Sequence, residues 1–239
     1  MLIELKKIVK NYDTGEVIVK VLREIDLSVD EGEFVAIMGP SGSGKSTMMH
    51  IIGFLDRPTS GEYYFDGENT KDFNDDELAR IRNDRIGFVF QSFNLLPRTS
   101  VLDNVLLPLQ YSSDKKNHLH RAKAALEAVG LSERLNFMSN QISGGQKQRV
   151  AIARALVCNP KVIFADEPTG NLDSKSGSTV MNILERLNKD GRTIILVTHD
   201  MNIALHADRI VTIRDGEIIS DKKVSASEKI HSKQVKEDE

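Results

Sequence analysis

The sequence predicts an α/β fold in which a mostly parallel sheet is flanked by a small antiparallel β subdomain and carries an inserted α-helical subdomain. Two observations support this prediction. Continuous apolar runs, typical of strands covered on both faces, occur at residues 34–38, 86–90, 162–165 and 194–197. Helical patterns separate several of these runs, as in a layered α/β core. The helix after the third run is expected to begin at an N-cap, Ser174.

The antiparallel part of the fold is predicted near the N-terminus. Residues with β-branched or other apolar side chains alternate with other residues in two sets: Val17, Val19 and Val21, then Ile25, Leu27 and Val29. Such period-two patterning is typical of antiparallel strands with one buried face. A further strand at Tyr63–Phe65 runs into the turn pair Asp66-Gly67.

The helical insertion is predicted between the second and third apolar runs. Residues 100–159 contain no strand-like run, and four apolar residues fall at helical spacing: Leu119, Ala122, Leu126 and Val129. Gly130 is a natural stop for this helix. Another helix is expected from about Gly145 to Asn159, ending before Pro160. We expect a helical subdomain over about residues 92–159, inserted into a core of about residues 1–91 and 160–222.

The last part of the chain is predicted to form a hairpin and a tail. Strand patterns at Arg209–Ile213 and Glu217–Ile219 flank the hairpin pair Asp215-Gly216. Residues 223–239 are rich in lysine and acidic residues and poor in large apolar ones. A flexible charged tail is therefore expected after a domain that covers residues 1–222.

Composition excludes several classes of protein. The chain has 239 residues, 40% of them hydrophobic, and a net charge of −3, which argues against a dominant nucleic-acid surface. No apolar run approaches the roughly 20 residues that span a bilayer. The N-terminus does not have the pattern of a secretory signal. A single cysteine, Cys158, leaves no internal disulfide, as expected in a reducing cytoplasm; core packing is favoured for it over chemistry.

A phosphate-binding loop is the first motif that carries chemistry. The pattern G-x-x-x-x-G-K-[ST] follows a buried run, precedes a helical stretch and comprises these residues: Gly39, Pro40, Ser41, Gly42, Ser43, Gly44, Lys45, Ser46 and Thr47. Its backbone N–H groups can converge on phosphate oxygens. Lys45 is expected to reach the β- and γ-phosphates of a nucleoside triphosphate, and Ser46 to coordinate Mg²⁺. The alternative, a glycine-rich surface turn, does not explain this context.

Two carboxylates end the third buried run. Asp166 and Glu167 follow apolar residues only, and a carboxylate pair there needs compensating charge, which a magnesium–phosphate cluster supplies. We expect Asp166 to bind the metal, through water, and Glu167 to polarise the attacking water. The alternative is an exposed pair at a strand end.

Two polar residues end other buried runs. His199 follows the fourth run, at the edge where parallel sheets bind ligands, and is expected to donate to the γ-phosphate rather than to be structural. Gln91 ends the second run at the same edge, and its carbonyl is expected to contact Mg²⁺ or the water.

The ordered set of motifs resembles the nucleotide-binding subunits of ATP-binding cassette (ABC) transporters over essentially residues 1–222. Besides the residues above, the resemblance rests on two segments: Ser143-Gly144-Gly145-Gln146 and Asn171-Leu172-Asp173. Alone, the first segment would be read as a flexible turn with an N-cap. The family commonly has leucine where this chain has Ile142, and the change preserves an apolar anchor.

The resemblance implies an ATPase that works as an ATP-dependent, head-to-tail homodimer. The phosphate loop of one subunit would face the Ser143 to Gln146 segment of the other across the γ-phosphate, and Asp173 would cross the dimer interface. Ser143 and the N–H groups after it are suited to bind an anion if they begin a helix. In this family an aromatic residue before the loop often stacks on adenine, and the resemblance implies that role for Tyr12, which lies at a comparable distance; the alternative is that it covers the edge of the small sheet.

The implied cofactors are ATP and Mg²⁺, and the implied partner is an integral membrane permease. The apolar residues of Ser92–Pro108 either belong to the core or form a groove for a short helix of that permease. The motifs at residues 104–109 and 166–173 resemble the subgroup that serves macrolide and peptide exporters or lipoprotein release. The chain is therefore expected to lie at the cytoplasmic face of the cell membrane.

Three other functions remain open on the sequence. One is a mechanical regulator similar to the cell-division ATPase of this family, which signals through membrane partners. A cassette ATPase that acts on DNA or ribosomes usually has a coiled-coil insert or tandem cassettes, and the sequence has neither. A phosphate-loop kinase would not explain the Ser-Gly-Gly-Gln segment.

Overall fold

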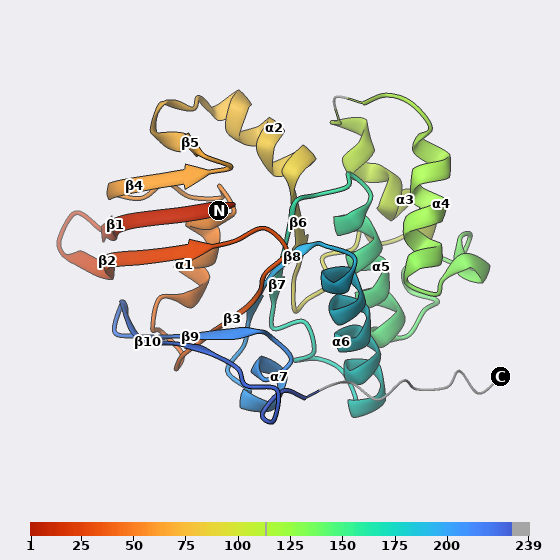
Figure 1. Cartoon of the computed structure of the whole chain (residues 1–239). Helices are drawn as coiled ribbons and strands as arrows, with labels where there is room; N and C mark the ends of the chain where they lie inside the picture. Colours follow the sequence, from red (N-terminus) through yellow and green to blue (C-terminus); the bar gives the residue numbers. More distant parts are fainter. Residues whose placement is uncertain (113, 231–239) are drawn as a thin grey trace. The chain divides into compact units, whose positions relative to one another are not determined.

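The computed structural model describes residues 1–112 and 114–230 of the chain, which form two compact units (Figure 1). The first unit combines Met1–Ala79 with Thr193–Ile230, and the second contains Arg80–Arg192. Helix α2 (Asp75–Arg85) begins in the first unit and ends in the second.

The first unit contains a four-stranded antiparallel sheet with the order β2-β1-β4-β5. Its strands are β1 (Ile3–Asp13), β2 (Ile18–Val29), β4 (Ser60–Phe65) and β5 (Glu68–Asn69). Ile3 pairs with Val29 of β2 on one side and with Phe65 of β4 on the other. The predicted antiparallel strands are confirmed, although the two alternating sets of the sequence largely belong to one long strand, β2.

The first unit also contains the strands that carry the phosphate loop, in the order β10-β9-β3-β8. They are β3 (Phe34–Met38), β8 (Thr193–Val197), β9 (Arg209–Arg214) and β10 (Glu217–Lys223). Strand β3 is fully buried and parallel to both β8 and β9, which explains its continuous apolar sequence. The hairpin from β9 to β10 turns at Asp215 and Gly216, which have φ angles of 50° and 82°. Positive φ at both turn residues is what a two-residue hairpin requires.

Short helices complete the first unit. They are α1 (Lys45–Ile52), the 3₁₀ turn η1 (Thr70–Asp72) and α7 (Met201–Ala204). Helix α1 packs against β2 and β8 and buries Met48, Met49, Ile51 and Ile52. Because α1 begins at Lys45, this packing also fixes the end of the phosphate loop.

The second unit pairs two parallel strands with several helices. Its strands are β6 (Ile86–Val89) and β7 (Val162–Asp166), with Ile86 opposite Val162. Its helices are α3 (Val101–Leu106), η2 (Leu107–Gln110), α4 (His118–Ala128), η3 (Ser132–Arg134), α5 (Gly144–Leu156) and α6 (Ser174–Lys189). Helices α3, α4 and α5 pack on one another, and α5 also packs against β6 (Figure 1).

The helix after β7 is capped differently from the prediction. The N-cap of α6 is Asp173, whose side chain accepts from the N–H of Ser176, and Ser174 is the first helical residue. Both Asp and Ser are good N-caps, so the local sequence alone could not show which of the two residues caps the helix.

Helix α5 begins after its N-cap, Ser143, and ends at Leu156, before the expected Asn159.

Part of the expected flexible tail is hydrogen-bonded to the first unit. Strand β10 continues to Lys223, the N–H of Val224 donates to Asp208 O (2.9 Å), and that of Ile230 donates to Leu205 O (3.1 Å). Lys229 also pairs with the Asp208 carboxylate. The rest of the predicted tail, residues 231–239, lies outside the described residues.

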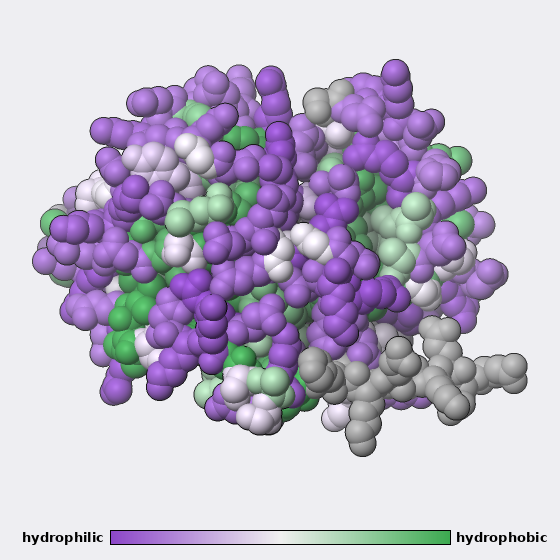
Figure 2. Space-filling model, in the orientation of Figure 1, coloured by the Kyte–Doolittle hydropathy of each residue, from purple (hydrophilic) through white to green (hydrophobic). Residues whose placement is uncertain are grey.

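The molecular face in Figure 2 is mostly hydrophilic, with apolar residues scattered among polar ones. Val17, Ile18 and Val19 are among the exposed large apolar side chains of the first unit. No helix in residues 1–112 and 114–230 has the length and apolar character needed to cross a bilayer.

We expect Gly87→Ala to lower the free energy of unfolding by about 1–3 kcal/mol, because β6 has no room for a methyl group there. A Cβ at Gly87 would lie 2.7 Å from the backbone oxygen of Ala155 on α5. Gly177→Ala in α6 is the matched control, since its Cβ would lie 3.6 Å from Thr169 and helix propensity favours alanine. Urea unfolding of both variants tests this, and equal stabilities would contradict it.

Candidate nucleotide-binding site

The phosphate loop connects β3 to α1 in a cradle built from backbone. A Cβ at Gly39 would lie 2.1 Å from the carbonyl oxygen of Ile213, and one at Gly44 would lie 2.8 Å from Cδ2 of Leu22. Gly42, with a φ of 79°, would meet nothing within 4 Å, so only its backbone conformation requires glycine. The conformation of the loop is therefore constrained by β9 and β2 on either side, and its glycines add no side chains of their own.

Two polar side chains of the loop are suited to receive an anion. The Nζ of Lys45 donates to the carbonyl oxygens of Gly39 (2.9 Å) and Pro40 (2.7 Å), so its charge lies over the loop. The hydroxyl of Ser43 is buried and has no hydrogen-bond partner in the described part of the chain. A buried hydroxyl without a partner is costly, and a phosphate oxygen would satisfy it.

His199 and Tyr12 belong to the same unit as the loop. His199 is exposed and follows β8, whose Val197 lies opposite Ile37 of β3, so both parallel strands lead to the same edge of the sheet. Tyr12 lies on β1 with 38% of its surface exposed, and its hydroxyl donates to Asp56 Oδ2 (2.8 Å). Burial, followed by this hydrogen bond, raises the pKa of Tyr12 above its usual value.

Asp166 and Glu167 lie at the end of β7 in the second unit, and both are half-buried. Glu167 has a φ of 45°, an unfavourable angle for a residue with a side chain. Its carbonyl oxygen accepts from the N–H of Gly170 (3.1 Å), which closes a tight turn. Backbone strain of this kind recurs at functional sites, where the surrounding structure holds it.

Gln91 lies against the segment that follows Glu167. The backbone oxygen of Gln91 accepts from Nδ2 of Asn171 (3.1 Å). A Cβ at Gly170 would lie 2.6 Å from Nε2 of Gln91. The structure therefore brings Gln91 and the turn after Glu167 together within the second unit, as the sequence predicts for residues at one sheet edge.

The Ser-Gly-Gly-Gln segment forms the start of α5. The Ser143 hydroxyl accepts from the N–H of Gln146 (3.3 Å), and Oε1 of Gln146 accepts from the N–H of Ser143 (2.9 Å), which is a capping box. A Cβ at Gly145 would lie 2.5 Å from Oγ of Ser176 in the first turn of α6. Glycine there lets the starts of the two helices approach closely.

Asp173 caps α6 beside this segment. Its carboxylate accepts from the N–H (3.0 Å) and the hydroxyl (2.7 Å) of Ser176. The hydrogen bond from the Ser176 backbone, followed by that from its hydroxyl, lowers the pKa of Asp173 below its usual value. The carboxylate therefore stays ionised at the helix start, where negative charge is favourable.

Two residues of α5 that the sequence interpretation missed support the site. Gln148 is fully buried and donates from Nε2 to the carbonyl oxygen of Pro168, the residue after Glu167 (2.8 Å). Arg154 donates to the carbonyl oxygens of Asn94 (2.6 Å) and Phe93 (2.9 Å), just after Gln91. Gln148 could have been found from the sequence, because it is a polar residue on the apolar face of a predicted helix.

The predicted site residues thus fall into two groups. The phosphate loop, Tyr12 and His199 lie in the first unit, whereas Gln91, Asp166, Asp173 and the start of α5 lie in the second. Glu167 belongs to the second group. Each unit holds its own group in place through contacts within that unit.

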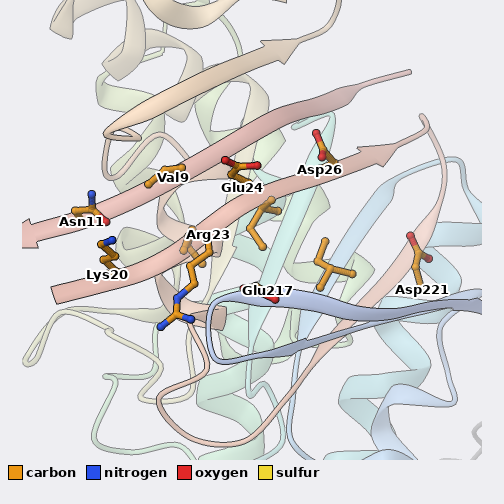
Figure 3. Close-up of a pocket in the computed structure, with 11 residues that line it drawn as sticks. Val9, Asn11, Lys20, Arg23, Glu24, Asp26, Glu217 and Asp221 are labelled. Atoms are coloured by element: carbon orange, nitrogen blue, oxygen red, sulfur yellow. The ribbon is translucent and has the colours of Figure 1, made fainter.

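A groove of about 970 Å³ lies between β2 and β10 of the first unit (Figure 3). Lys20 and Arg23 line it from β2, and Glu217 and Asp221 line it from β10. None of the predicted site residues is among those that line it.

A glycine-rich loop between a buried parallel strand and a helix, with an acidic pair at the end of another such strand, defines a phosphate-loop nucleoside triphosphatase. Residues 22–170 match the ABC transporter family. The chain belongs to this family, as an ATP-binding cassette ATPase. The expected α/β fold and ATPase class are thereby confirmed.

Two of the similar proteins are matched over nearly their whole length. The chain is 52% identical over 229 residues to the ABC transporter ATP-binding protein MJ0796 of Methanocaldococcus jannaschii. The aligned region covers 93% of this chain and 97% of that protein. The chain is 54% identical over 219 residues to the ABC transporter ATP-binding protein YknY of Bacillus subtilis, covering 91% of this chain and 95% of that protein.

A longer relative is the macrolide export ATP-binding/permease protein MacB of Bdellovibrio bacteriovorus, which is 52% identical over 225 residues. The match covers 94% of this chain and 34% of MacB, so the chain spans about a third of that relative's length. Among solved structures, dimeric MJ0796 in a post-hydrolysis state bound to ADP and Pi has a TM-score of 0.85 at 49% identity and covers 94% of this chain and 100% of that chain.

We expect Arg154→Met to loosen the segment after Gln91, because it removes two hydrogen bonds from a cation to backbone oxygens. Such bonds contribute about 1.5–3 kcal/mol each, so amide hydrogen exchange over residues 92–96 should be at least about tenfold faster. Arg149→Met is the matched control: Arg149, also on α5, donates to the carbonyl oxygens of Val129 and Gly130. Equal exchange of residues 92–96 in both variants would contradict this role of Arg154.

Proposed function

We propose that the chain is the ATP-hydrolysing subunit that powers a membrane permease of an export or lipoprotein-release system. The observation that carries the proposal is the phosphate loop, with its crowded glycines and with Lys45 and Ser43 placed to receive phosphate. The names of the relatives support a transport role. MacB joins an ATP-binding and a permease function in one protein, and this chain corresponds to about a third of it.

ATP binding begins with an exchange of partners at the loop. Lys45 leaves the carbonyl oxygens of Gly39 and Pro40 for the β- and γ-phosphates, and Ser43 gains an acceptor for its hydroxyl. The N–H groups from Gly39 to Thr47 cradle the phosphates at the positive end of α1. Tyr12 stacks on the adenine, which contributes about 0.5–1.5 kcal/mol.

The residues proposed for Mg²⁺ offer suitable donors. Ser46 has a hydroxyl oxygen at the start of α1, Asp166 a carboxylate at the end of β7, and Gln91 an amide oxygen. Oxygen ligands of these kinds are those that Mg²⁺ prefers, with nucleotide phosphates and water completing its shell. When bound, Mg²⁺ neutralises the charge that develops on the β- and γ-phosphates.

Hydrolysis depends on three further polar groups. Glu167 accepts a proton from the attacking water, at a position fixed by the turn through Gly170 and by the bond of Gln148 to Pro168. Gln91 contacts the water or the metal. His199 donates to the γ-phosphate, where charge develops in the transition state.

Two copies complete each site in this proposal. The start of α5, from Ser143 to Gln146, binds the γ-phosphate held by the partner's loop, since the first N–H groups of a helix have no partner within it. Asp173 lies at the same interface. Dimeric structures of MJ0796 support the formation of a dimer. ATP binding closes the dimer, and hydrolysis followed by release of phosphate opens it.

We place the chain at the cytoplasmic face of the membrane, as a peripheral subunit without a nucleic-acid partner, in keeping with its net charge of −3. In this organisation residues 1–222 form the cassette, and residues 92–159 form the helical subdomain that contacts the permease. Val101 and Val105 of the segment Ser92–Pro108 are buried in the core, so the contact is proposed for its exposed apolar residues, such as Leu96.

We expect Glu167→Gln to reduce phosphate release by about 10²–10⁴-fold without loss of ATP binding, because the amide cannot accept the proton. The variant should form a long-lived dimer with ATP and Mg²⁺, measured by light scattering after size exclusion. ADP is the control and should leave the variant monomeric. Normal hydrolysis, or a strictly monomeric variant at saturating ATP, would contradict the proposal.

The transport role has its own test. The chain, purified with the permease from its native membrane, should move substrate into or out of lipid vesicles only when ATP is supplied. The Glu167→Gln complex should not do so. ATP hydrolysis by an intact complex that moves no substrate would favour the regulatory ATPase instead.

A further inference from the structure

Lys10 of β1 is an unusual lysine, because only 9% of its surface is exposed. Its Nζ donates to Asp56 Oδ1 (2.6 Å) and to the carbonyl oxygen of Arg57 (2.8 Å). The same nitrogen lies 4.8 Å from the centroid of the Tyr12 ring, which is a cation–π contact. The three donor directions of the ammonium are thus accounted for by a carboxylate, a carbonyl and an aromatic face.

Asp56 connects this lysine to the tyrosine hydroxyl. Oδ1 of Asp56 accepts from Lys10 and from the N–H of Arg57 (2.7 Å), while Oδ2 accepts from the Tyr12 hydroxyl (2.8 Å). Burial alone would raise the pKa of Asp56, but the hydrogen bonds from Lys10 and Tyr12 outweigh it and hold that pKa below the usual value. The three side chains therefore form one compensated cluster.

The cluster is attached to the helix that begins in the phosphate loop. The N–H of Asp56 donates to the carbonyl oxygen of His50 (3.2 Å), near the C-terminal end of α1. At the other end of α1, the hydroxyl of Thr47 also acts on the Tyr12 hydroxyl, lowering its pKa, although burial and Asp56 together raise it more. Through Asp56, the tyrosine is thus connected to the C-terminal end of the helix whose first residue is Lys45.

We infer that Lys10 and Asp56 are positioning residues for the nucleotide base, which fix the Tyr12 ring and leave a single face of it open for stacking. The inference rests on the proposed function, in which Tyr12 stacks on adenine. Lys10 covers one face, and the exposed 38% of Tyr12 leaves surface for a base. A ring already fixed in place loses little rotational freedom when the base binds, so affinity rises without any contact of Lys10 or Asp56 to the nucleotide.

The test compares ATP with tripolyphosphate, which has the phosphates but no base. We expect Lys10→Met to weaken ATP binding about 3–10-fold, measured by calorimetry, and to leave tripolyphosphate binding unchanged. The KM for ATP hydrolysis should rise by the same factor and kcat should stay constant. Lys10→Arg should restore much of the affinity, since a guanidinium can bind the carboxylate and stack on the ring.

Lys6→Met is the matched control. Lys6 lies on the same strand, with its Nζ 4.6 Å from the centroid of the Tyr64 ring. Loss of this second cation–π contact should leave ATP affinity unchanged. If Lys10→Met fails to fold, the same comparison is made with Asp56→Asn, which keeps the shape of the side chain but removes its charge. We expect Asp56→Asn to weaken binding of ATP but not of tripolyphosphate.

Tyr12→Leu separates failure of this inference from failure of the proposed function. If Tyr12→Leu leaves ATP affinity unchanged, the stacking role is wrong and the inference falls with it. If Tyr12→Leu weakens ATP binding but Lys10→Met does not, the positioning role alone is overturned. An equal loss for ATP and tripolyphosphate in Lys10→Met would also overturn it, since the effect would then lie at the phosphate loop. In the Tyr12→Leu background, Lys10→Met should have no further effect on ATP binding.

Discussion

The phosphate loop depends on the close approach of its glycines to neighbouring backbone. The oxygen of Ile213 on β9 occupies the space of a Cβ at Gly39, and Leu22 and Val21 on β2 do the same at Gly44. These contacts come from strands on two sides of the loop, and they restrict the conformation that its backbone can adopt between β3 and α1. Its N–H groups can converge on an anion because the glycines bring no side chains of their own into the cradle. The antiparallel sheet therefore does more than cover the core, since β2 helps to shape the cradle.

In the second unit, helix α5 has a comparable organising role. Its start is the capped Ser143 segment, its middle holds the turn after Glu167 through Gln148, and its C-terminal half holds the segment after Gln91 through Arg154. A helix is stiff, and its attachments through Gln148 and Arg154 act on backbone oxygens rather than on flexible side chains. A shift of α5 would therefore be transmitted to the turn after Glu167 and to the residues after Gln91. We regard this helix as the element that keeps the second group of site residues in register.

Much of the fold could be predicted because parallel strands buried on both faces leave a continuous apolar sequence. Runs 34–38, 162–165 and 194–197 correspond closely to β3, β7 and β8. The boundaries were less certain where local chemistry is ambiguous, as at the cap of α6, where Asp173 rather than Ser174 supplies the oxygen. The phosphate loop was recognisable because its chemistry requires a contiguous pattern.

Residues whose role depends on distant partners could not be predicted. A lysine in a strand is normally exposed, and Lys10 is buried only because Asp56, 46 residues later, is folded against it. In the sequence, Arg154 likewise resembles any exposed arginine of a helix. Its role becomes visible only in the fold, where residues 93 and 94 accept its hydrogen bonds. Neither pairing has a local signal in the sequence, because each is set by tertiary packing.

In the proposed mode of nucleotide binding, the Lys10–Asp56 pairing lets one short helix serve both ends of the nucleotide. The first residue of α1, Lys45, belongs to the phosphate loop, and Asp56, just beyond its last turn, holds the Tyr12 ring. An eight-residue helix rises about 12 Å, so in this proposed mode base and phosphates would meet groups attached to the same rigid segment. A displacement of α1 would move the phosphate cradle and the tyrosine anchor together. If Tyr12 binds the base as proposed, base recognition and phosphate recognition are mechanically linked in the first unit, through α1 and the Lys10–Asp56 pair rather than through the nucleotide alone.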